Sequence, residues 1–302
     1  MATNIKIALI QLHPKPLSPT YNLSKATRHI EAAASRGAHL AILPEYAVTS
    51  WQPSSPNFLS SCESASSALS VFKHLAETHH IAIVPGTIVE KLPNGALANV
   101  CYFISSKGEV VSRYVKRNLW HPERGVLSPD QRPHEPFDTE FGKVGLLVCW
   151  DLAFPEAARE LVSKGAKLIV APAWWLMNDA GDQGAALNPQ SETVFLESLI
   201  VCRAFENTCA IAFVNAANPA TEGERGADIE ANGGMVRGFA GLSQVGMPIL
   251  GALGRMGAAE GMEIVEVDMG VLDVAEENYR VREDLAREDW HYLVSSKASE
   301  AE

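Results

Sequence analysis

The chain has 302 residues, of which 47% are hydrophobic and 20% charged, so it has the composition of an ordinary packed globular protein. Its formal net charge of −11 disfavours a nucleic-acid backbone or an anionic membrane surface as a partner. The two longest uncharged stretches, residues 46–62 and 238–254, are interrupted by Ser, Pro or Gly, and neither predicts a membrane span. Five cysteines without a recognisable secretory signal favour a reducing compartment, and we expect the cytoplasm.

Short apolar runs alternate along the chain with segments of helical periodicity. Strands are predicted at residues 5–12, 40–43, 81–89, 100–104, 109–115, 144–149, 168–171, 210–215, 242–247 and 263–268. Helices are predicted at residues 24–36, 64–79, 154–164, 191–207 and 271–278. Turn sequences at residues 92–95 and 105–108 predict two hairpins. This order predicts one α/β domain over residues 1–302, with a mixed sheet buried by helices and with residues 279–302 as a charged C-terminal arm.

Three predicted strands end on side chains that can do chemistry. Glu45 follows the strand at 40–43, Lys116 follows the strand at 109–115, and Cys149 ends the strand at 144–149. Taken singly, the charged residues are expected to be solvated and the cysteine to be an inert core residue. Taken together at strand ends, where α/β folds gather their functional groups, they favour a base, a cation and a nucleophile.

These three residue types suit nucleophilic attack on a carbonyl carbon. A cysteine attacks as the thiolate, so it needs a nearby base, for which Glu45 is the candidate. Lys116 is the candidate for stabilising the oxyanion, together with the backbone N–H of Trp150. The predicted helix at 154–164 begins close behind Cys149, and its N-terminus would favour negative charge there.

The residues around these positions resemble the three motifs of the nitrilase superfamily of carbon–nitrogen hydrolases, which carry a Glu, a Lys and a Cys in that order. Leu-Pro-Glu ends at Glu45, Tyr-Val-Lys ends at Lys116, and Gly-Leu-Leu-Val-Cys-Trp-Asp places Cys149 fifth. The resemblance extends over about residues 4–280 and includes Gln11, the segment 203–207 and Asn215. Three motifs in order are far more specific than any one of them, so the chain is identified as a member of this superfamily, in its amidase-type branch.

Membership implies an α-β-β-α four-layer sandwich and protomers that pair as a homodimer or a higher homo-oligomer through a helical face, for which the helices at 154–164 and 191–207 are the candidates. It also implies a fourth functional residue, acidic and shortly after the lysine. Glu123 occupies that place, with the implied role of positioning the substrate or holding Lys116. The alternative is a loop carboxylate paired with Arg124 or Arg117.

Several tryptophans fall near the expected site. Trp174 and Trp175 follow a predicted strand, and with Trp120 and Trp150 they either wall an apolar substrate pocket or pack in the core or a dimer interface. Tyr46, beside Glu45, is also expected to contact substrate. No metal is predicted, because His-Glu-x-x-His and Cys-x-x-Cys are absent from the sequence. Residues 241–246 lack the spacing of a serine-hydrolase elbow, and residues 251–257 lack that of a nucleotide-binding loop.

The function predicted from the sequence is that of a cofactor-free amidohydrolase, which cleaves a small non-peptide amide through a Cys149 thioester and uses water as the second substrate. Within the superfamily, the alternatives are a nitrilase and an N-carbamoyl hydrolase. Outside the enzymes, the alternative is a catalytically inactive binding or scaffold protein of the same fold.

Two local features bear on the substrate. Ala153 stands where ω-amidase-like relatives typically carry an arginine that holds a substrate carboxylate, so such a substrate is disfavoured unless another residue, for example Arg237, substitutes. Cys149 is followed by Trp150 and Asp151, which resembles the Cys-x-Asp of amidases more than the Cys-x-Glu of nitrile hydrolases. We therefore expect an amide to be preferred over the matched nitrile.

Overall fold

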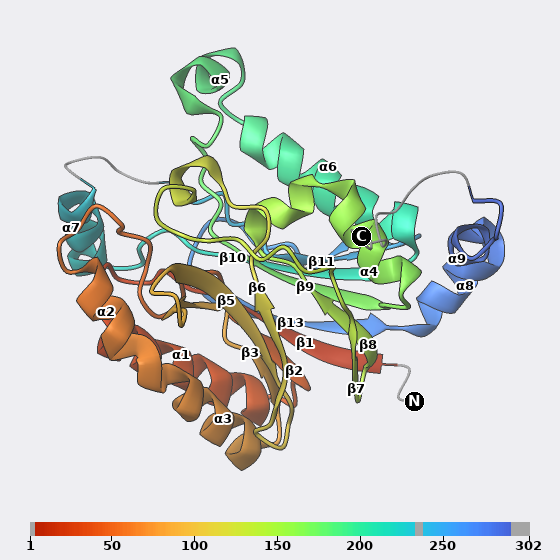
Figure 1. Cartoon of the computed structure of the whole chain (residues 1–302), viewed down its shortest axis with the longest axis horizontal. Coiled ribbons are helices and arrows are strands. Elements are labelled where there is room, and N and C mark those ends of the chain that lie inside the picture. The colour runs from red at the N-terminus through yellow and green to blue at the C-terminus, as the bar shows by residue number, and fades with distance from the viewer. Residues whose placement is uncertain (1–3, 233–237, 291–302) are drawn as a thin grey trace.

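The computed structural model describes residues 4–232 and 238–290, which form two sheets covered on their outer faces by helices (Figure 1). The first sheet has the order β13-β1-β2-β3-β5-β4, with β6 paired to β5. Its strands are β1 (Asn4–Gln11), β2 (Leu40–Ile42), β3 (Ala82–Val84), β4 (Thr87–Lys91), β5 (Leu97–Ile104), β6 (Val110–Val115) and β13 (Gly261–Asp268). β1, β2 and β3 run parallel, whereas β4, β5, β6 and β13 pair antiparallel to their neighbours.

The second sheet has the order β12-β11-β10-β9-β8-β7. Its strands are β7 (Phe137–Thr139), β8 (Gly142–Leu146), β9 (Leu168–Ala173), β10 (Ala210–Asn215), β11 (Gln244–Met247) and β12 (Gly251–Leu253). β8, β9 and β10 are parallel neighbours, so their carboxyl ends meet at one edge of the sheet. In open α/β sheets that edge is where ligands bind.

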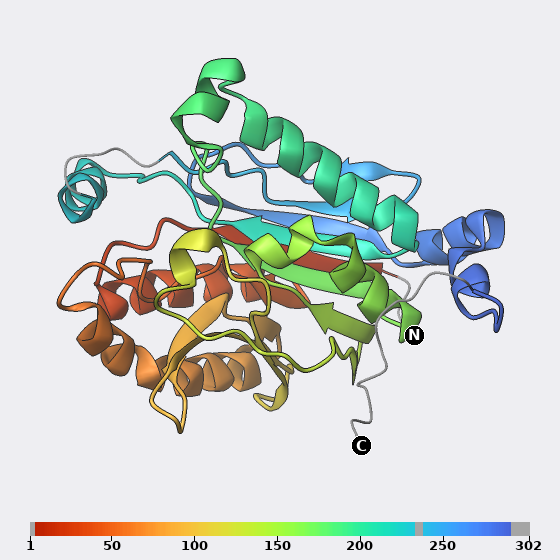
Figure 2. The same cartoon turned by 45° about the horizontal axis from the view of Figure 1, so that its top comes forward.

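The helices lie in two outer layers. The longer ones are α1 (Pro19–Ser35), α3 (Ala68–His79), α4 (Pro155–Ser163) and α6 (Ser191–Asn207). The remaining ones are α2 (Phe58–Ser64), α5 (Gly181–Leu187), α7 (Glu222–Ala231), α8 (Gly270–Tyr279) and α9 (Val281–Leu285). Figure 2 shows α4 and α6 over the second sheet, on the opposite side of the molecule from α1 and α3. The layer order is therefore α-β-β-α, as the resemblance to the nitrilase superfamily implied.

The alternation of side chains along β1 explains this layering. Ile5, Ile7 and Leu9 belong to the buried cluster that the two sheets share, while Ala8 and Ile10 point to the cluster beneath α1 and α3. Successive side chains of a strand point to opposite faces, so a strand buried on both faces needs apolar residues throughout. This requirement accounts for the continuous apolar runs in the sequence.

Most predicted strands and helices are present, with shifted ends. The strand predicted at 81–89 is wrong as one element: β3 ends at Val84 and β4 begins at Thr87. Gly86 lies between them at φ 70°, and a Cβ there would come within 1.7 Å of the Pro44 carbonyl oxygen. The helix predicted at 64–79 corresponds to α3, which begins only at Ala68 because residues 65–67 form a 3₁₀ turn. The elements that were not predicted are α2, α5, α7, α9, β7 and β12.

The end of the described chain is held to the body by Arg282. Its guanidinium donates hydrogen bonds to the backbone oxygens of Val162, Ala166 and Thr208, although α9 itself buries no residue.

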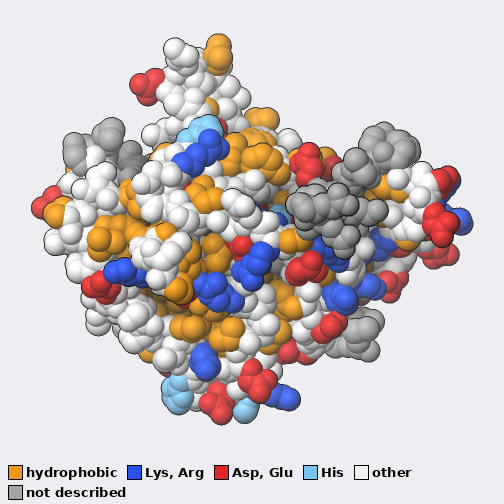
Figure 3. All heavy atoms as spheres, in the orientation of Figure 1, with side chains coloured by type: hydrophobic (Ala, Val, Ile, Leu, Met, Phe, Trp, Pro, Cys, Tyr) orange, Lys and Arg blue, Asp and Glu red, His pale blue; other side chains and the backbone are white. Residues whose placement is uncertain are grey.

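Exposed hydrophobic side chains gather near the start of α6. Leu187, Val194 and Phe195 are 90%, 55% and 37% exposed, and Figure 3 shows hydrophobic atoms on this part of the surface, below the projecting α5. Within the described residues, no helix is both long and apolar enough to cross a membrane.

Candidate active site

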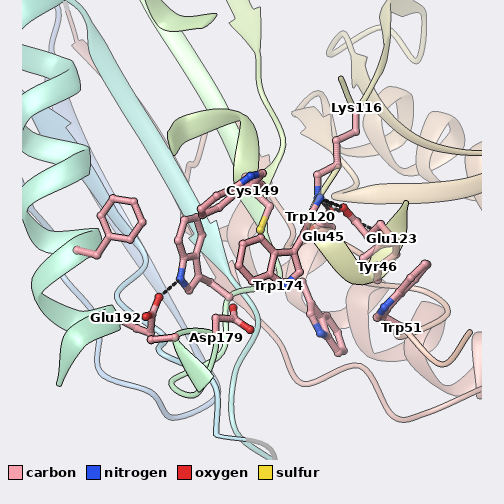
Figure 4. A pocket seen from close by; sticks show the side chains of 14 residues that line it. Glu45, Tyr46, Trp51, Lys116, Trp120, Glu123, Cys149, Trp174, Asp179 and Glu192 are labelled. Carbon is pink, nitrogen blue, oxygen red and sulfur yellow. Dashed lines mark hydrogen bonds and ion pairs between the residues drawn. The ribbon is translucent and has the colours of Figure 1, made fainter. Parts of the chain in front are cut away.

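The carboxyl ends of strands from both sheets meet around one cavity of about 170 Å³ (Figure 4). Glu45 follows β2 and Lys116 follows β6, both from the first sheet, while Cys149 follows β8 of the second sheet. All three side chains line the cavity and are almost completely buried. The structure thus brings together three residues that are widely separated in the sequence.

Cys149 lies in a constrained turn. It has φ 48°, a left-handed conformation that is uncommon for a residue other than glycine and that recurs at functional sites. Asp151 holds this turn, because its Oδ2 accepts the backbone N–H of Val148 at 2.9 Å and the hydroxyl of Tyr114 at 2.7 Å. Its Oδ1 accepts the backbone N–H of Asn118 at 2.8 Å and the Asn118 side chain at 3.0 Å. Asp151 therefore links the Cys149 turn to the segment that carries Lys116.

Lys116 lies between two carboxylates. Its Nζ is 2.9 Å from Oε1 of Glu45 and 2.8 Å from Oε2 of Glu123. Burial alone would lower its pKa, but the charges of Glu123 and Glu45 outweigh that effect and hold the pKa of Lys116 well above its usual value. An ammonium group has three N–H donors, so one remains after Glu45 and Glu123 are satisfied.

One carboxylate oxygen of Glu45 accepts hydrogen bonds, and the other accepts none of standard geometry. Oε1 accepts from Lys116 and, at 2.7 Å, from the side chain of Asn99, whereas Oε2 is buried without a hydrogen-bond partner of standard geometry. Burial raises the pKa of Glu45 to about 7, with Lys116 opposing the rise and Glu123 adding to it. A carboxyl group with a pKa near neutrality suits proton transfer in both directions.

The surroundings of the Cys149 sulfur favour the neutral thiol. Burial raises its pKa well above the usual value, and the charge of Glu45 raises it further. Lys116 and a hydrogen bond from the backbone N–H of Trp174 act in the opposite direction. The Trp174 N–H is thus a donor beside the sulfur that the sequence analysis, which considered only the Trp150 N–H, did not identify.

Glu123 is not paired with Arg124 or Arg117. Besides contacting Lys116, it accepts hydrogen bonds from the Tyr46 hydroxyl and from the backbone N–H of Trp120. Arg124 instead donates to the backbone oxygen of Leu119. Tyr46 lines the cavity but is 1% exposed, and its oxygen also accepts from Asn99 at 3.0 Å. Its main contacts are with Glu123 and Asn99, so its hydroxyl supports the charged cluster.

Aromatic side chains form most of the cavity wall, as one of the two interpretations of the tryptophans predicted. The rings that line it belong to Tyr46, Trp51, Trp120, Trp150, Trp174, Trp175 and Phe195. The ring centroids of Trp120 and Trp150 are 4.4 Å apart, and those of Trp150 and Trp175 are 5.7 Å apart. Such a wall accommodates a small apolar or polarisable group.

Sequence reasoning missed several residues of the cavity and its support. Trp51, Asp179, Glu192 and Phe195 line the cavity, and Asn99 supports Glu45 from within β5. Asn99 could have been found from the sequence, because it is a polar residue inside an apolar strand. The four other residues have no such sequence feature. Arg237, considered for a substrate carboxylate, lies outside the described residues. Across residues 4–232 and 238–290, no group of three or more His, Cys, Asp or Glu side chains is arranged to hold a metal ion.

Comparison with known proteins identifies a family model and several relatives that this chain resembles. The family model described as carbon-nitrogen hydrolase matches residues 6–263. A protein named nitrilase from Pyrococcus abyssi is 33% identical over 177 residues, which cover 56% of this chain and 64% of that protein. A protein named 2-oxoglutaramate amidase from Bacillus subtilis is 26% identical over 272 residues, which cover 89% of this chain and 93% of that protein.

A solved structure of similar fold is a mutant of the amidase from Nesterenkonia sp. AN1, which shows Michael addition of acrylamide at its active-site cysteine. It is 26% identical to this chain, with a TM-score of 0.71, and the match covers 91% of this chain and 98% of that one. The names of these relatives include both amidase and nitrilase, so they leave the substrate open.

Proposed function

Because the chain belongs to the carbon–nitrogen hydrolase family, we propose that it is an amidase that hydrolyses a small non-peptide amide through a thioester on Cys149. The observation that carries this proposal is the buried Lys116 ammonium, which contacts both Glu45 and Glu123 in the same cavity as the Cys149 thiol. Burying a cation and two carboxylates costs desolvation free energy. Buried ionisable groups with perturbed pKa values of this kind concentrate at functional sites.

In the first half of the proposed reaction, Oε2 of Glu45 takes the proton of the Cys149 thiol and the sulfur attacks the amide carbon. The carbonyl oxygen becomes an oxyanion, which accepts the third N–H of Lys116 and a backbone N–H, for which we propose Trp150. Glu45 then gives its proton to the amide nitrogen. The C–N bond breaks, ammonia or an amine leaves, and the acyl group stays on the sulfur as a thioester.

In the second half, water enters the cavity and Glu45 takes one of its protons. The resulting hydroxide attacks the thioester carbon, and the same donors hold the second oxyanion. Collapse of this intermediate expels the sulfur, which regains its proton from Glu45, and releases a carboxylic acid. Glu45 thus acts as a base and as an acid in each half, which is consistent with its pKa of about 7.

Glu123 is proposed to act through Lys116. Its carboxylate accepts from Tyr46, Trp120 and Lys116 at once, so it is fixed and in turn fixes the ammonium group. A fixed donor stabilises an oxyanion without reorganising during the reaction.

An ammonia-release screen over a panel of primary amides, nitriles and N-carbamoyl compounds tests the proposal. We expect release from at least one class of amide together with the corresponding carboxylic acid in equal amount. Release from carbamoyl compounds alone would replace the amidase proposal with an N-carbamoyl hydrolase. If no compound is cleaved, the inactive binding or scaffold protein of the same fold becomes the better account.

A nitrilase is the second candidate, favoured by the name of the Pyrococcus abyssi relative. Nitriles would form their thioester with the same three residues, so the cluster itself does not discriminate. The position of the backbone donor after Cys149 does bear on the choice, because an amide adduct places an oxyanion where a nitrile adduct has nitrogen. With Asp151 holding that turn, we propose that kcat/KM for propionamide exceeds that for propionitrile by at least about tenfold. Faster turnover of propionitrile would favour the nitrilase.

A further inference from the structure

The charged residues that line the cavity are mostly acidic. Among its described lining residues, four are acidic, namely Glu45, Glu123, Asp179 and Glu192, and Lys116 is the one Lys or Arg. Lys116 is already in contact with Glu45 and Glu123. Glu192 lies beyond that cluster, and its printed hydrogen-bond partners, Trp175 and Ser191, are neutral, so its carboxylate would attract a positively charged part of a bound substrate.

Glu192 is the most informative of these residues. It lies in the first turn of α6 and is 6% exposed, and its carboxylate accepts the Trp175 Nε1–H at 2.7 Å and the Ser191 hydroxyl at 3.4 Å. Within the described chain, no basic side chain lies within ion-pair distance of it. Neutral donors and the N-terminus of α6 compensate part of the cost, but a buried carboxylate is normally paired with a cation. Because Glu192 lines the cavity, a cationic group of a bound substrate could pair with it there.

Glu192 is placed to contact the end of an acyl chain that is distant from the reacting amide carbon. In Figure 4, Glu192 and Asp179 lie on the opposite side of Cys149 from Glu45, Lys116 and Glu123. An acyl group that extends from the sulfur away from the catalytic cluster would thus approach Glu192. The ring of Phe195 is 5.5 Å from that of Trp175, so this end of the cavity is also aromatic. Aromatic faces attract cations, and tryptophan does so most strongly.

An independent sign of a ligand comes from Trp174. This residue is 8% exposed and lines the cavity, and its Nε1–H has no hydrogen-bond partner among the described residues. A buried indole N–H usually has an acceptor, so this donor points to a polar atom that a bound molecule supplies.

We propose that the substrates of this site are small amides whose acyl chain carries a positive charge, such as an amine or a guanidine, held by Glu192 between aromatic rings. This inference rests on the proposed amidase function and names its substrate class. The cavity of about 170 Å³ is smaller than typical sites for drug-sized ligands, which limits the acyl chain to a few atoms. Ala153 supplies no positive charge, which agrees with a preference against carboxylate-bearing substrates.

The test uses three primary amides of nearly equal size: γ-aminobutyramide, which is cationic, pentanamide, which is neutral, and succinamate, which is anionic. We expect kcat/KM for γ-aminobutyramide to exceed that for pentanamide by at least about tenfold, with succinamate the poorest. In Glu192→Gln, the side-chain oxygen still accepts the Trp175 N–H, so the local structure is kept while the charge is removed. The ratio of the cationic to the neutral substrate should then fall by about tenfold.

Glu197→Gln is the matched control, because Glu197 lies on the same helix, pairs with Arg255 at the surface and does not line the cavity. Its ratio should equal that of the wild type. If amides are cleaved but pentanamide or succinamate is preferred, or if Glu192→Gln leaves the ratio unchanged, this inference is wrong while the amidase proposal stands.

A binding measurement keeps the inference testable if no amide is cleaved. Butylammonium chloride should raise the Tm of the wild type and of Glu197→Gln more than sodium chloride of equal ionic strength, and should not do so in Glu192→Gln. An equal effect of the two salts on the wild type would overturn the inference whatever the catalytic result.

Discussion

Replacing Asp151 by asparagine tests whether the Cys149 turn is held in the geometry that catalysis requires. Asp151 is completely buried and accepts four hydrogen bonds, two of them from the backbone N–H groups of Val148 and Asn118. Asparagine has nearly the same shape, but its amide nitrogen cannot accept. Whichever way the amide is oriented, its nitrogen faces one of the two backbone N–H groups.

The size of the effect follows from that one unsatisfied group. A buried donor left without its acceptor costs about 1–3 kcal/mol of folding free energy. In a chain of this length, that corresponds to a fall in Tm of roughly 2–5 °C. The substitution should also lower the catalytic rate, because this turn holds Cys149 at φ 48°. A displacement of a reacting group by about 1 Å can cost ~100-fold in rate. We predict a fall in kcat/KM of at least about tenfold.

Thermal unfolding and steady-state ammonia release on the same preparations measure both effects. Asp138→Asn is the control, because Asp138 is an exposed residue of β7 in the same sheet, and it should match the wild type in both assays. Wild-type Tm and kcat/KM in Asp151→Asn would show that the turn does not depend on Asp151, and would refute the reasoning.

Four further predictions follow from the site and the family. Because Glu45 must be deprotonated to act as a base, its pKa of about 7 predicts that kcat/KM rises about tenfold per pH unit below pH 7 and levels off above it; a flat profile from pH 5 to 8 would contradict this role. Lys116, with its raised pKa, should cause no loss of activity up to pH 9. Dialysis against a chelator should leave activity intact while thiol alkylation of the cavity abolishes it, and restoration of a chelated sample by zinc would reveal a metal dependence. The exposed Val194 and Phe195 of α6 support a homodimer through α4 and α6, so light scattering at micromolar concentration should give twice the chain mass, and a fully active monomer would refute this.

The sequence was informative where the structure depends on local pattern. Apolar runs predicted the strands, and the chemistry-bearing residues at their ends predicted that Glu45, Lys116 and Cys149 would meet. These predictions worked because the carboxyl ends of β2 and β6 in the first sheet and of β8 in the second lie around one cavity. The break at Gly86 escaped prediction, because it depends on the close approach of Pro44 from a distant part of the chain.

Two other residues that line the cavity were not predicted either, because contacts between distant parts of the chain place them there. Glu192 begins a helix, where an acidic residue is normally solvated, and only the packing of α6 against Trp175 turns it into the cavity. Trp51 lies in a stretch rich in serine and proline that has no periodicity, and it reaches the site by stacking on Tyr46. Tertiary packing that has no counterpart in local sequence determines both positions.

The central claim is that Cys149 is the nucleophile, and ammonia release by Cys149→Ala tests it most directly. The substitution removes one buried atom, so the fold should be kept, which the Tm of the variant checks. Cys202→Ala is the control, because Cys202 is an exposed free thiol outside the cavity. The account predicts that Cys149→Ala loses activity by a factor of about 1,000 or more while Cys202→Ala retains it. Near-normal amide hydrolysis by a folded Cys149→Ala would contradict it.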